Sequence, residues 1–178
     1  MINPGWKTYL DYLWDVLQHK WWVFVECWQL GIPWLGVVHD LSKFHPLEFP
    51  HAARRYKGTE RQKRAAKQTY PRAWLHHQHS NKHHWIYWAV YMPIPRFEWD
   101  AEWGCIPIPD KYRKEMLADW CGAGRRFGKP PLQWYSEQRD KILLHPETRA
   151  WIERQIGYTG TITTLTRPAP GAEEETDG

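Results

Sequence analysis

Hydrophobic residues near the N-terminus recur every three or four positions, which is the spacing of an amphipathic helix. The helix is expected to begin after Asn3, with Pro4 in its first turn, because asparagine caps helices and proline is tolerated at their start. It can run to Leu30, with Gly31 as its stop. The positions that share this spacing are Trp6, Tyr9, Leu10, Leu13, Trp14 and Leu17. The pattern predicts one long N-terminal helix with an apolar face.

The rest of the chain has helical spacing and almost no alternation of period two, so strands are not expected. Pro46, Pro109 and Pro146 each stand where a helix can begin. The predicted helical segments are 33–40, 46–57, 60–69, 71–79, 83–91, 109–127, 131–142 and 146–156. Residues 92–108, rich in proline and aromatics, are expected to form a long ordered loop. The fold class is therefore predicted to be all-α, a single helical bundle with a polar centre.

Size and composition fit an ordinary globular domain. The chain has 178 residues, of which 42% are hydrophobic, and this is enough for one domain with a buried core. Its three cysteines form no CxxC pair, which argues against a disulfide framework and a zinc ribbon and suits a reducing cytoplasm. The most apolar run, residues 21–38, is interrupted by Glu26, Gln29 and Pro33. We therefore expect a cytoplasmic protein without a membrane partner.

Fourteen tryptophans are present, a large number for a chain of this length. Most of them lie on apolar stripes and are expected to fill the core. Trp85, Trp88, Trp99 and Trp103 follow the main group of histidines closely enough to wall a pocket, where stacking on a nucleobase would be one use.

Charge is distributed unevenly along the chain. The last eleven residues hold four acids and no base, so the remaining body carries +8 against +4 for the whole. We expect a helical domain over residues 1–158 and a disordered acidic tail over residues 159–178. Between Arg54 and Arg72, eight lysines and arginines accompany a single acid, Glu60. This segment is either a solvated helix face or a rim that attracts phosphate groups, and a nucleic-acid partner is not favoured because few aromatic residues are interleaved.

Histidine is concentrated in residues 76–84, HHQHSNKHH, where five of nine side chains are imidazoles. A second candidate is the doublet His39-Asp40 in GVVHDLSKF, because neighbouring His and Asp ligands at a helix end can reach one metal ion. His19 lies in the first helix, and Asp119 lies among apolar residues, where an unpaired carboxylate is costly to bury. Each residue alone has a structural explanation. Their order along the chain indicates a metal site.

Short motifs in this order resemble a known superfamily. The residues His19, His39-Asp40, His76-His77 and Asp119 resemble the HD superfamily of metal-dependent phosphohydrolases. The segments HDLSKF, HHQHSNKHHW, LADWCGAG and HPETR together look like a small HD-like family of phages and bacteria, over about residues 9–155. The resemblance implies an all-helical HD-type domain with a metal site at its centre.

The ligand set that this resemblance implies combines imidazoles with carboxylates. Such donors suit Fe, Mn, Co or Zn rather than Mg or Ca, which prefer oxygen ligands. A first ion would be held by His19, His39, Asp40 and Asp119. If Asp40 bridges, His76 and His77 would hold a second ion, and the pair would clamp a hydroxide for attack on phosphorus. The expected cofactor is one or two divalent transition-metal ions.

Three further residues are expected to act on the substrate. Lys43 follows Asp40 by three positions, so a continued helix would place its ammonium one turn from the metal, where it can hold a phosphate oxygen. The chain is expected to end one helix at Ser80 and cap the next. This places His83 and His84 in a first helical turn, directed to the substrate or to the surroundings of the ligands. A packing or surface role is the alternative for each of the three.

The sequence thus predicts a metal-dependent phosphohydrolase that acts on a nucleotide or another small phosphorylated molecule through a metal-bound hydroxide. One alternative is an HD-type di-iron oxygenase, because the same ligand pattern supports O₂ chemistry in inositol and phosphonate oxygenases. Another is a non-catalytic protein whose metal is structural and whose basic segment binds a polyanion. Neither the substrate nor the oligomeric state follows from the sequence.

Overall fold

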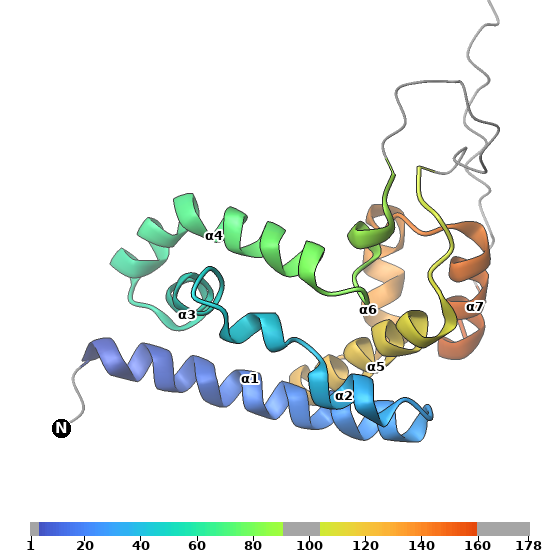
Figure 1. The fold of residues 1–178 in the computed structure, drawn as a ribbon, viewed down its shortest axis with the longest axis horizontal. Coiled ribbons are helices and arrows are strands. Elements are labelled where there is room, and N and C mark those ends of the chain that lie inside the picture. Colours follow the sequence, from blue (N-terminus) through green and yellow to red (C-terminus); the bar gives the residue numbers. More distant parts are fainter. Residues whose placement is uncertain (1–3, 91–103, 160–178) are drawn as a thin grey trace, which may run out of the picture.

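A computed structural model describes residues 4–90 and 104–159 of the chain. Within these two ranges the protein is all-α, as predicted, and β-type pairing is limited to an isolated bridge between Ala89 and Cys105. Figure 1 shows the order of the helices. Their bounds are α1 Pro4–Gln29, α2 Pro33–Val38, η1 Leu41–Phe44, α3 Phe49–Lys57, α4 Glu60–Ser80, η2 Trp85–Trp88, α5 Asp110–Phe127, α6 Pro131–Gln138, η4 Arg139–Lys141 and α7 Pro146–Ile156, where η denotes a short 3-10 helix.

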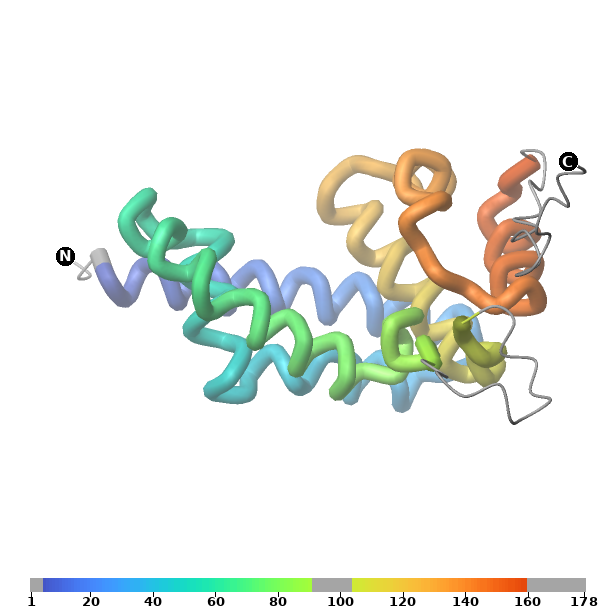
Figure 2. Tube along the Cα trace, turned by 90° about the horizontal axis from the view of Figure 1, so that it is seen from above, coloured from blue at the N-terminus to red at the C-terminus, as the bar shows by residue number. Residues whose placement is uncertain are grey.

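The long helix α1 is the base on which the other helices are assembled. It contacts α5, α2 and α3, and α3 in turn packs against α4. In Figure 1 α4 extends over α1 with α3 between them, and Figure 2 shows α6 and α7 toward the end of the molecule away from the N-terminus. The space enclosed by α1, α3, α4 and α5 is where the polar side chains of the predicted site gather.

The crossing of α1 and α5 depends on small residues. A Cβ atom at Gly122 of α5 would come within 2.8 Å of the Val23 Cγ2 atom of α1, so only glycine allows this approach. Val23 and Ala118 are fully buried at the same crossing. The close contact brings the neighbouring turns of the two helices together, and with them His19 and Asp119.

Helix ends follow local signals in the sequence. α1 stops before Gly31, whose φ of 73° lies in the left-handed region that favours glycine. α4 begins with a capping box, in which the side chains of Thr59 and Gln62 each accept a hydrogen bond from the other residue's backbone N–H. The predicted N-terminal helix and the helices 109–127 and 146–156 are confirmed to within a residue at each end.

The predicted segments 60–69 and 71–79 are a single helix, α4, with Pro71 inside it. Proline has no N–H, so the carbonyl of Lys67 loses its helical hydrogen bond. Both residues are exposed, and water can hydrate the free carbonyl oxygen. The expected break at Pro71 is therefore absent.

Four other predicted helices are shorter than expected. The segment 46–57 begins only at Phe49, and 131–142 divides into α6 and η4. The segment 33–40 stops at Val38, and 83–91 is reduced to the turn η2. Adjacent side chains of a helix point about 100° apart. Two neighbouring residues therefore reach one centre only where the backbone leaves the helical conformation, as it does at both doublets that meet in the site, His39-Asp40 and His83-His84.

The apolar stripe predicted for α1 faces the solvent, and another face of the helix packs on the core. Trp6, Leu10, Trp14 and Leu17 of that stripe are exposed, whereas Tyr12, Val16, His19 and Val23 are buried. Among the tryptophans in the described ranges only Trp120 is buried, which contradicts the expectation that most of them fill the core.

The largest hydrophobic cluster joins α5, α6 and α7 around Met116, Tyr135 and Ile152. Trp85 and Trp88 pack against this cluster and do not line the pocket described below, so they are not the pocket wall that was predicted. A smaller cluster around Tyr12 and Ala53 holds α1 against α3.

Parts of three predictions lie outside the described residues. The loop 92–108 is described only over residues 104–108, the tail 159–178 only at Thr159, and Trp99 and Trp103 not at all. The domain boundary at residue 158 stays a prediction. Over the described ranges, no helix combines the length and apolar character that crossing a membrane requires.

Candidate metal centre

The His39-Asp40 doublet sits where α2 gives way to η1. Asp40 has φ 53° and ψ 28°, and it is the one residue other than glycine with a positive φ in the described chain. Such a conformation costs on the order of 1 kcal/mol and, where it persists, points to a functional constraint. Lys20 of α1 helps to hold it, because its ammonium donates hydrogen bonds to the carbonyl oxygens of Val37 and His39. The backbone is thus shaped so that both side chains of the doublet point inward.

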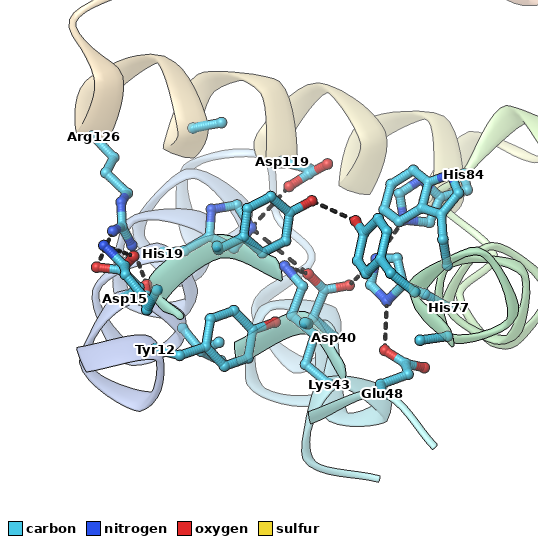
Figure 3. Close-up of a pocket in the computed structure, with 18 of the residues that line it drawn as sticks. Tyr12, Asp15, His19, Asp40, Lys43, Glu48, His77, His84, Asp119 and Arg126 are labelled. Carbon is cyan, nitrogen blue, oxygen red and sulfur yellow. Dashed lines mark hydrogen bonds and ion pairs between the residues drawn. The ribbon is translucent and has the colours of Figure 1, made fainter. Parts of the chain in front are cut away.

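One oxygen of Asp40 belongs to a first group of four donors, contributed by His19, His39, Asp40 and Asp119. The Nε2 atom of His19 lies 3.0 Å from Asp119 Oδ1 and 3.7 Å from Asp40 Oδ2. The Nε2 atom of His39 lies 3.2 Å from Asp40 Oδ2 and 3.5 Å from Asp119 Oδ1. The structure therefore brings all four residues of the predicted first site together. Figure 3 shows three of them, His19, Asp40 and Asp119.

The other oxygen of Asp40 faces a second group of donors, contributed by Asp40, His77, His83 and His84. Asp40 Oδ1 lies 3.6 Å from His77 Nε2 and 3.4 Å from His83 Nε2. The Nε2 atoms of His77 and His84 are 2.9 Å apart. In Figure 3 Asp40 lies between His19 on one side and His77 and His84 on the other. Asp40 is therefore shared by both groups.

Both groups have dimensions that fit a transition-metal ion. Ligands at about 2.1 Å from one ion lie about 3.0–3.4 Å from each other in octahedral or tetrahedral arrangements, close to the separations found here. Within the described chain four buried side-chain atoms have no hydrogen-bond partner, and three belong to these groups: His39 Nε2, Asp40 Oδ1 and His83 Nε2. Orphaned polar atoms are costly inside a protein. A cation between them would remove that cost.

Two carboxylates orient the histidines from outside. Glu115 Oε1 lies 3.1 Å from His39 Nδ1 and 3.2 Å from His83 Nδ1. Glu48 Oε2 lies 3.0 Å from His77 Nδ1. A carboxylate accepts a hydrogen bond, so each of these Nδ1 atoms carries the proton and each Nε2 keeps its lone pair for the centre. Carboxylate–histidine pairs of this kind are typical of metal sites.

The comparisons with known proteins bear on the family alone. A family model described as a family of unknown function, DUF5662, matches residues 8–158. The chain belongs to the DUF5662 family. No curated protein and no solved structure matches it.

The DUF5662 site carries strongly coupled charges. Burial alone would raise the pKa of Asp40, but the nearby His39, Lys43 and His77 outweigh it and hold that pKa well below its usual range. Burial likewise opposes protonation of His39, yet Asp40, Asp119 and Glu115 raise the pKa of this imidazole well above normal. Protons therefore compete with a metal ion for the same donors.

Lys43 is where the sequence predicted it, one turn after Asp40. Its Nζ atom lies 2.6 Å from Asp40 Oδ2. Burial alone would lower the pKa of Lys43, but Asp40 and Asp119 outweigh it and raise the pKa, so the ammonium stays charged. Its role toward a substrate stays a prediction.

A pocket of about 480 Å³ opens from both donor groups (Figure 3). The end beside the donor groups is formed by His19, Asp40, Lys43, His77, His84 and Asp119. Its other walls carry the aromatic side chains Tyr12, Tyr56, Tyr70, Trp74 and Phe127. Near its far end Asp15 pairs with both Lys57 and Arg126.

The predicted residues of the histidine-rich segment divide differently than expected. His77 joins the second donor group, but His76 does not, because it bonds Glu48 Oε1 at 2.6 Å and its side chain is 31% exposed. His83 and His84, predicted to face the substrate or the surroundings of the ligands, lie among the candidate ligands themselves. The structure thus replaces His76 in the predicted second site by this pair.

Glu115 and Glu48 are the functional candidates that the sequence reasoning missed. Glu115 stands four residues before Asp119, on the same face of α5, and this spacing could have identified it. Nothing in the sequence marks Glu48, whose position depends on how α3 packs against α4.

Proposed function

We propose that this protein is a metal-dependent phosphohydrolase that acts on a small phosphate ester. The proposal rests on one observation, that both donor groups open onto the same pocket, through His19 and Asp119 from the first group, His77 and His84 from the second, and Asp40 from both. A structural metal site is closed by protein ligands, whereas a catalytic site keeps a position for water or substrate. The open pocket supports a catalytic role.

The side chains around the pocket suit phosphoryl transfer to water. Transition-metal ions held by the two donor groups would act as Lewis acids and lower the pKa of water toward neutrality. Lys43 adds a fixed positive charge at the pocket wall, where a phosphate oxygen carries negative charge. Glu48 and Glu115 keep the imidazoles oriented toward the centre.

The charges of the pocket favour a substrate with one phosphate group. Lys57 and Arg126 share one carboxylate, that of Asp15, so two cations less one anion leave a net charge of +1 there rather than +2 for a second or third phosphate. Tyr56, Tyr70 and Trp74 form an aromatic wall instead. The volume lies in the range of small-molecule sites. A nucleoside monophosphate combines these features, a single phosphate and an aromatic remainder.

Metal analysis of anaerobically purified protein, followed by phosphate release from a panel of esters, tests the proposal. Nucleoside monophosphates are expected to be hydrolysed faster than triphosphates. Asp40→Asn is expected to abolish both metal binding and activity. The matched control is Asp140→Asn, at a carboxylate that is 96% exposed, and it is expected to leave both unchanged.

Two other outcomes would overturn the proposal. Oxygen consumption without phosphate release from any ester would favour the di-iron oxygenase, which the same donors also suit. Metal binding without either activity, together with steeply salt-dependent binding of DNA or RNA, would favour the polyanion-binding alternative. Two of the basic side chains that this alternative needs are engaged within the chain, Arg54 with Tyr9 and Lys63 with Glu60.

A further inference from the structure

The solvent face of α1 carries an apolar stripe, which α2 approaches at Phe24. Its members recur at alternating spacings of four and three residues: Leu10, Trp14, Leu17, Trp21, Phe24 and Trp28. Five of them are 46–66% exposed, and Phe24 is half-buried. In Figure 1 α1 runs along the lower edge of the molecule, with no described element beneath it. We name these six residues the α1 seam.

The seam is too large to be ordinary surface. At these exposed fractions a tryptophan leaves about 150 Å² in water and a leucine about half as much. Together with Trp6, 67% exposed, the stripe presents about 700 Å². The largest apolar patch of a typical monomer is about 300–600 Å², and a standard protein–protein interface buries about 800 Å² per partner. The area matches what a stable dimer needs.

The spacing of the seam identifies its partner as another helix. Apolar residues that repeat every 3.5 positions form the contact line of a two-stranded coiled coil. The seam aromatics are already ordered along the helix, since Phe24 lies 6.1 Å from Trp21 and 6.0 Å from Trp28 between ring centroids. We propose that the protein forms a homodimer in which two α1 seams pack antiparallel.

Residue sizes select the antiparallel orientation. In an antiparallel pair centred near residue 19, Trp21 faces the partner's Leu17, Trp28 faces the partner's Leu10, and Trp14 faces the partner's Phe24. Each tryptophan then packs against a different, smaller side chain, and large and small residues alternate along the contact. A parallel pair would stack tryptophan on tryptophan and leucine on leucine. That arrangement overfills some layers and leaves others loose.

Charge argues against a membrane as the occupant. Helices that lie on anionic lipid carry free lysine or arginine beside their apolar face. The lysines of α1 are engaged within the chain, Lys7 by Asp11 and Lys20 by the carbonyl of His39. The proposed dimer also leaves the metal centre accessible, because the seam and His19 lie on different faces of α1. The dimer proposal is therefore independent of the proposed function.

Molar mass measured by light scattering during size exclusion tests the dimer. The full chain is expected to have twice its monomer mass of 21.4 kDa. Leu17→Glu buries a charge in the seam twice per dimer and is expected to raise the dissociation constant about a hundredfold or more. Leu143→Glu is the matched control, since Leu143 is 41% exposed and Leu17 46%. It is expected to stay dimeric. Far-UV circular dichroism and metal content check the fold of each variant.

Mixing two variants tests the orientation. Leu17→Glu and Trp21→Lys are each expected to be monomeric alone. When they are mixed, an antiparallel pair places the introduced glutamate opposite the introduced lysine and restores a heterodimer. If a charged variant loses helix content, the double variant Leu17→Ala/Trp21→Ala serves as the test, because it removes apolar contact area without adding a charge. It is expected to weaken the dimer.

Three results would overturn the proposal. A wild-type chain that is monomeric at about 100 µM, well above the micromolar to picomolar dissociation constants of interfaces of this size, excludes the dimer. A dimer that Leu17→Glu leaves intact uses another surface. A monomer that sediments with phosphatidylglycerol vesicles, and loses that ability in Leu17→Glu, assigns the seam to a membrane surface instead.

Discussion

The Nε2 atoms of His77 and His84 face each other at 2.9 Å, although His77 belongs to the last turn of α4 and His84 precedes η2. Burial and the neighbouring His83 and His77 lower the pKa of His84 well below its usual range. His84 is therefore neutral near pH 7, and a neutral imidazole can donate a lone pair to a metal ion.

This pairing predicts which histidines hold the second ion. His83→Ala and His84→Ala are each expected to lose about one ion per chain, measured by elemental analysis of the purified protein. His76→Ala is the control from the same segment, because His76 bonds Glu48 outside the donor groups. It is expected to keep its full metal content. Loss of metal in His76→Ala, with retention in the other two, would reverse the assignment.

Glu115 is expected to act on the metal through His39 and His83. Glu115→Gln weakens the acceptor that orients both imidazoles, and the affinity for the metal is expected to fall about 10–100-fold. Competition with a coloured chelator measures this change. Glu60→Gln, at a side chain that is 76% exposed, is expected to have no effect. Equal affinities in the two variants would mean that Glu115 only fills space.

Metal-free protein is expected to lose stability on both sides of neutrality. The depressed pKa values of Asp40 and Asp119 contribute stability above about pH 3.8, which is lost as the pH falls through their folded values. The raised pKa of His39 contributes stability that is complete below about pH 6.5 and is lost as the pH rises through its folded value.

Urea unfolding in the presence of chelator, from pH 3 to 10, measures both effects. Added metal is expected to stabilise the protein more at alkaline than at acidic pH, because ligation needs neutral imidazoles. A His39→Gln variant is expected to lack the alkaline decline. If the decline persists unchanged in that variant, His39 is not its source.

Trp74 is expected to set substrate preference without holding metal. Its ring stacks on His77 at 5.3 Å between centroids, and it lines the pocket. Stacking on a base contributes about 1–3 kcal/mol, so Trp74→Leu is expected to raise the KM of a nucleoside monophosphate about tenfold. Hydrolysis of glycerol phosphate and metal content should not change. Trp34→Leu, at an exposed tryptophan of α2 that does not line the pocket, is the control.

Local signals made much of the fold predictable from the sequence. The N-terminal helix, α5 and α7 each have a proline at their start and a glycine just after their end. These residues set the local backbone conformation that starts or ends a helix, so they can be recognised in the sequence. The helix does not break at Pro71 as predicted, because the exposed carbonyl that loses its helical hydrogen bond can be hydrated by water. Helix α2 ends early, at Val38, and the helix predicted over residues 83–91 is reduced to η2, because polar side chains next to them turn inward. The spacing of hydrophobic residues carries no information about such polar side chains.

The first donor group was predictable because its residues stand in a recognisable order along the chain. The second was not, because the roles of His76, His83 and His84 depend on the turn after Ser80. In the helix, His76 and His77 point in different directions, so only one of them reaches Asp40. The turn brings His83 and His84 back to the same point.

The exposed face of α1 also escaped prediction. The helix is apolar on more than one side, so periodicity alone does not select the side that meets α3 and α5. Contacts distant in sequence, such as Tyr12 with Phe49, decide which stripe is buried.

The donors of the first group span residues 19 to 119, from α1 to the middle of α5. A ribosome that has delivered only the N-terminal hundred residues has produced His19, His39 and Asp40 but not Asp119. An ion at this first group would be held only once α5 has docked on α1, because a shorter nascent fragment lacks the fourth donor. Ion binding at the first group would therefore follow the docking of α5, and a chain truncated before Asp119 would lack the ion there that stabilises it against proteolysis.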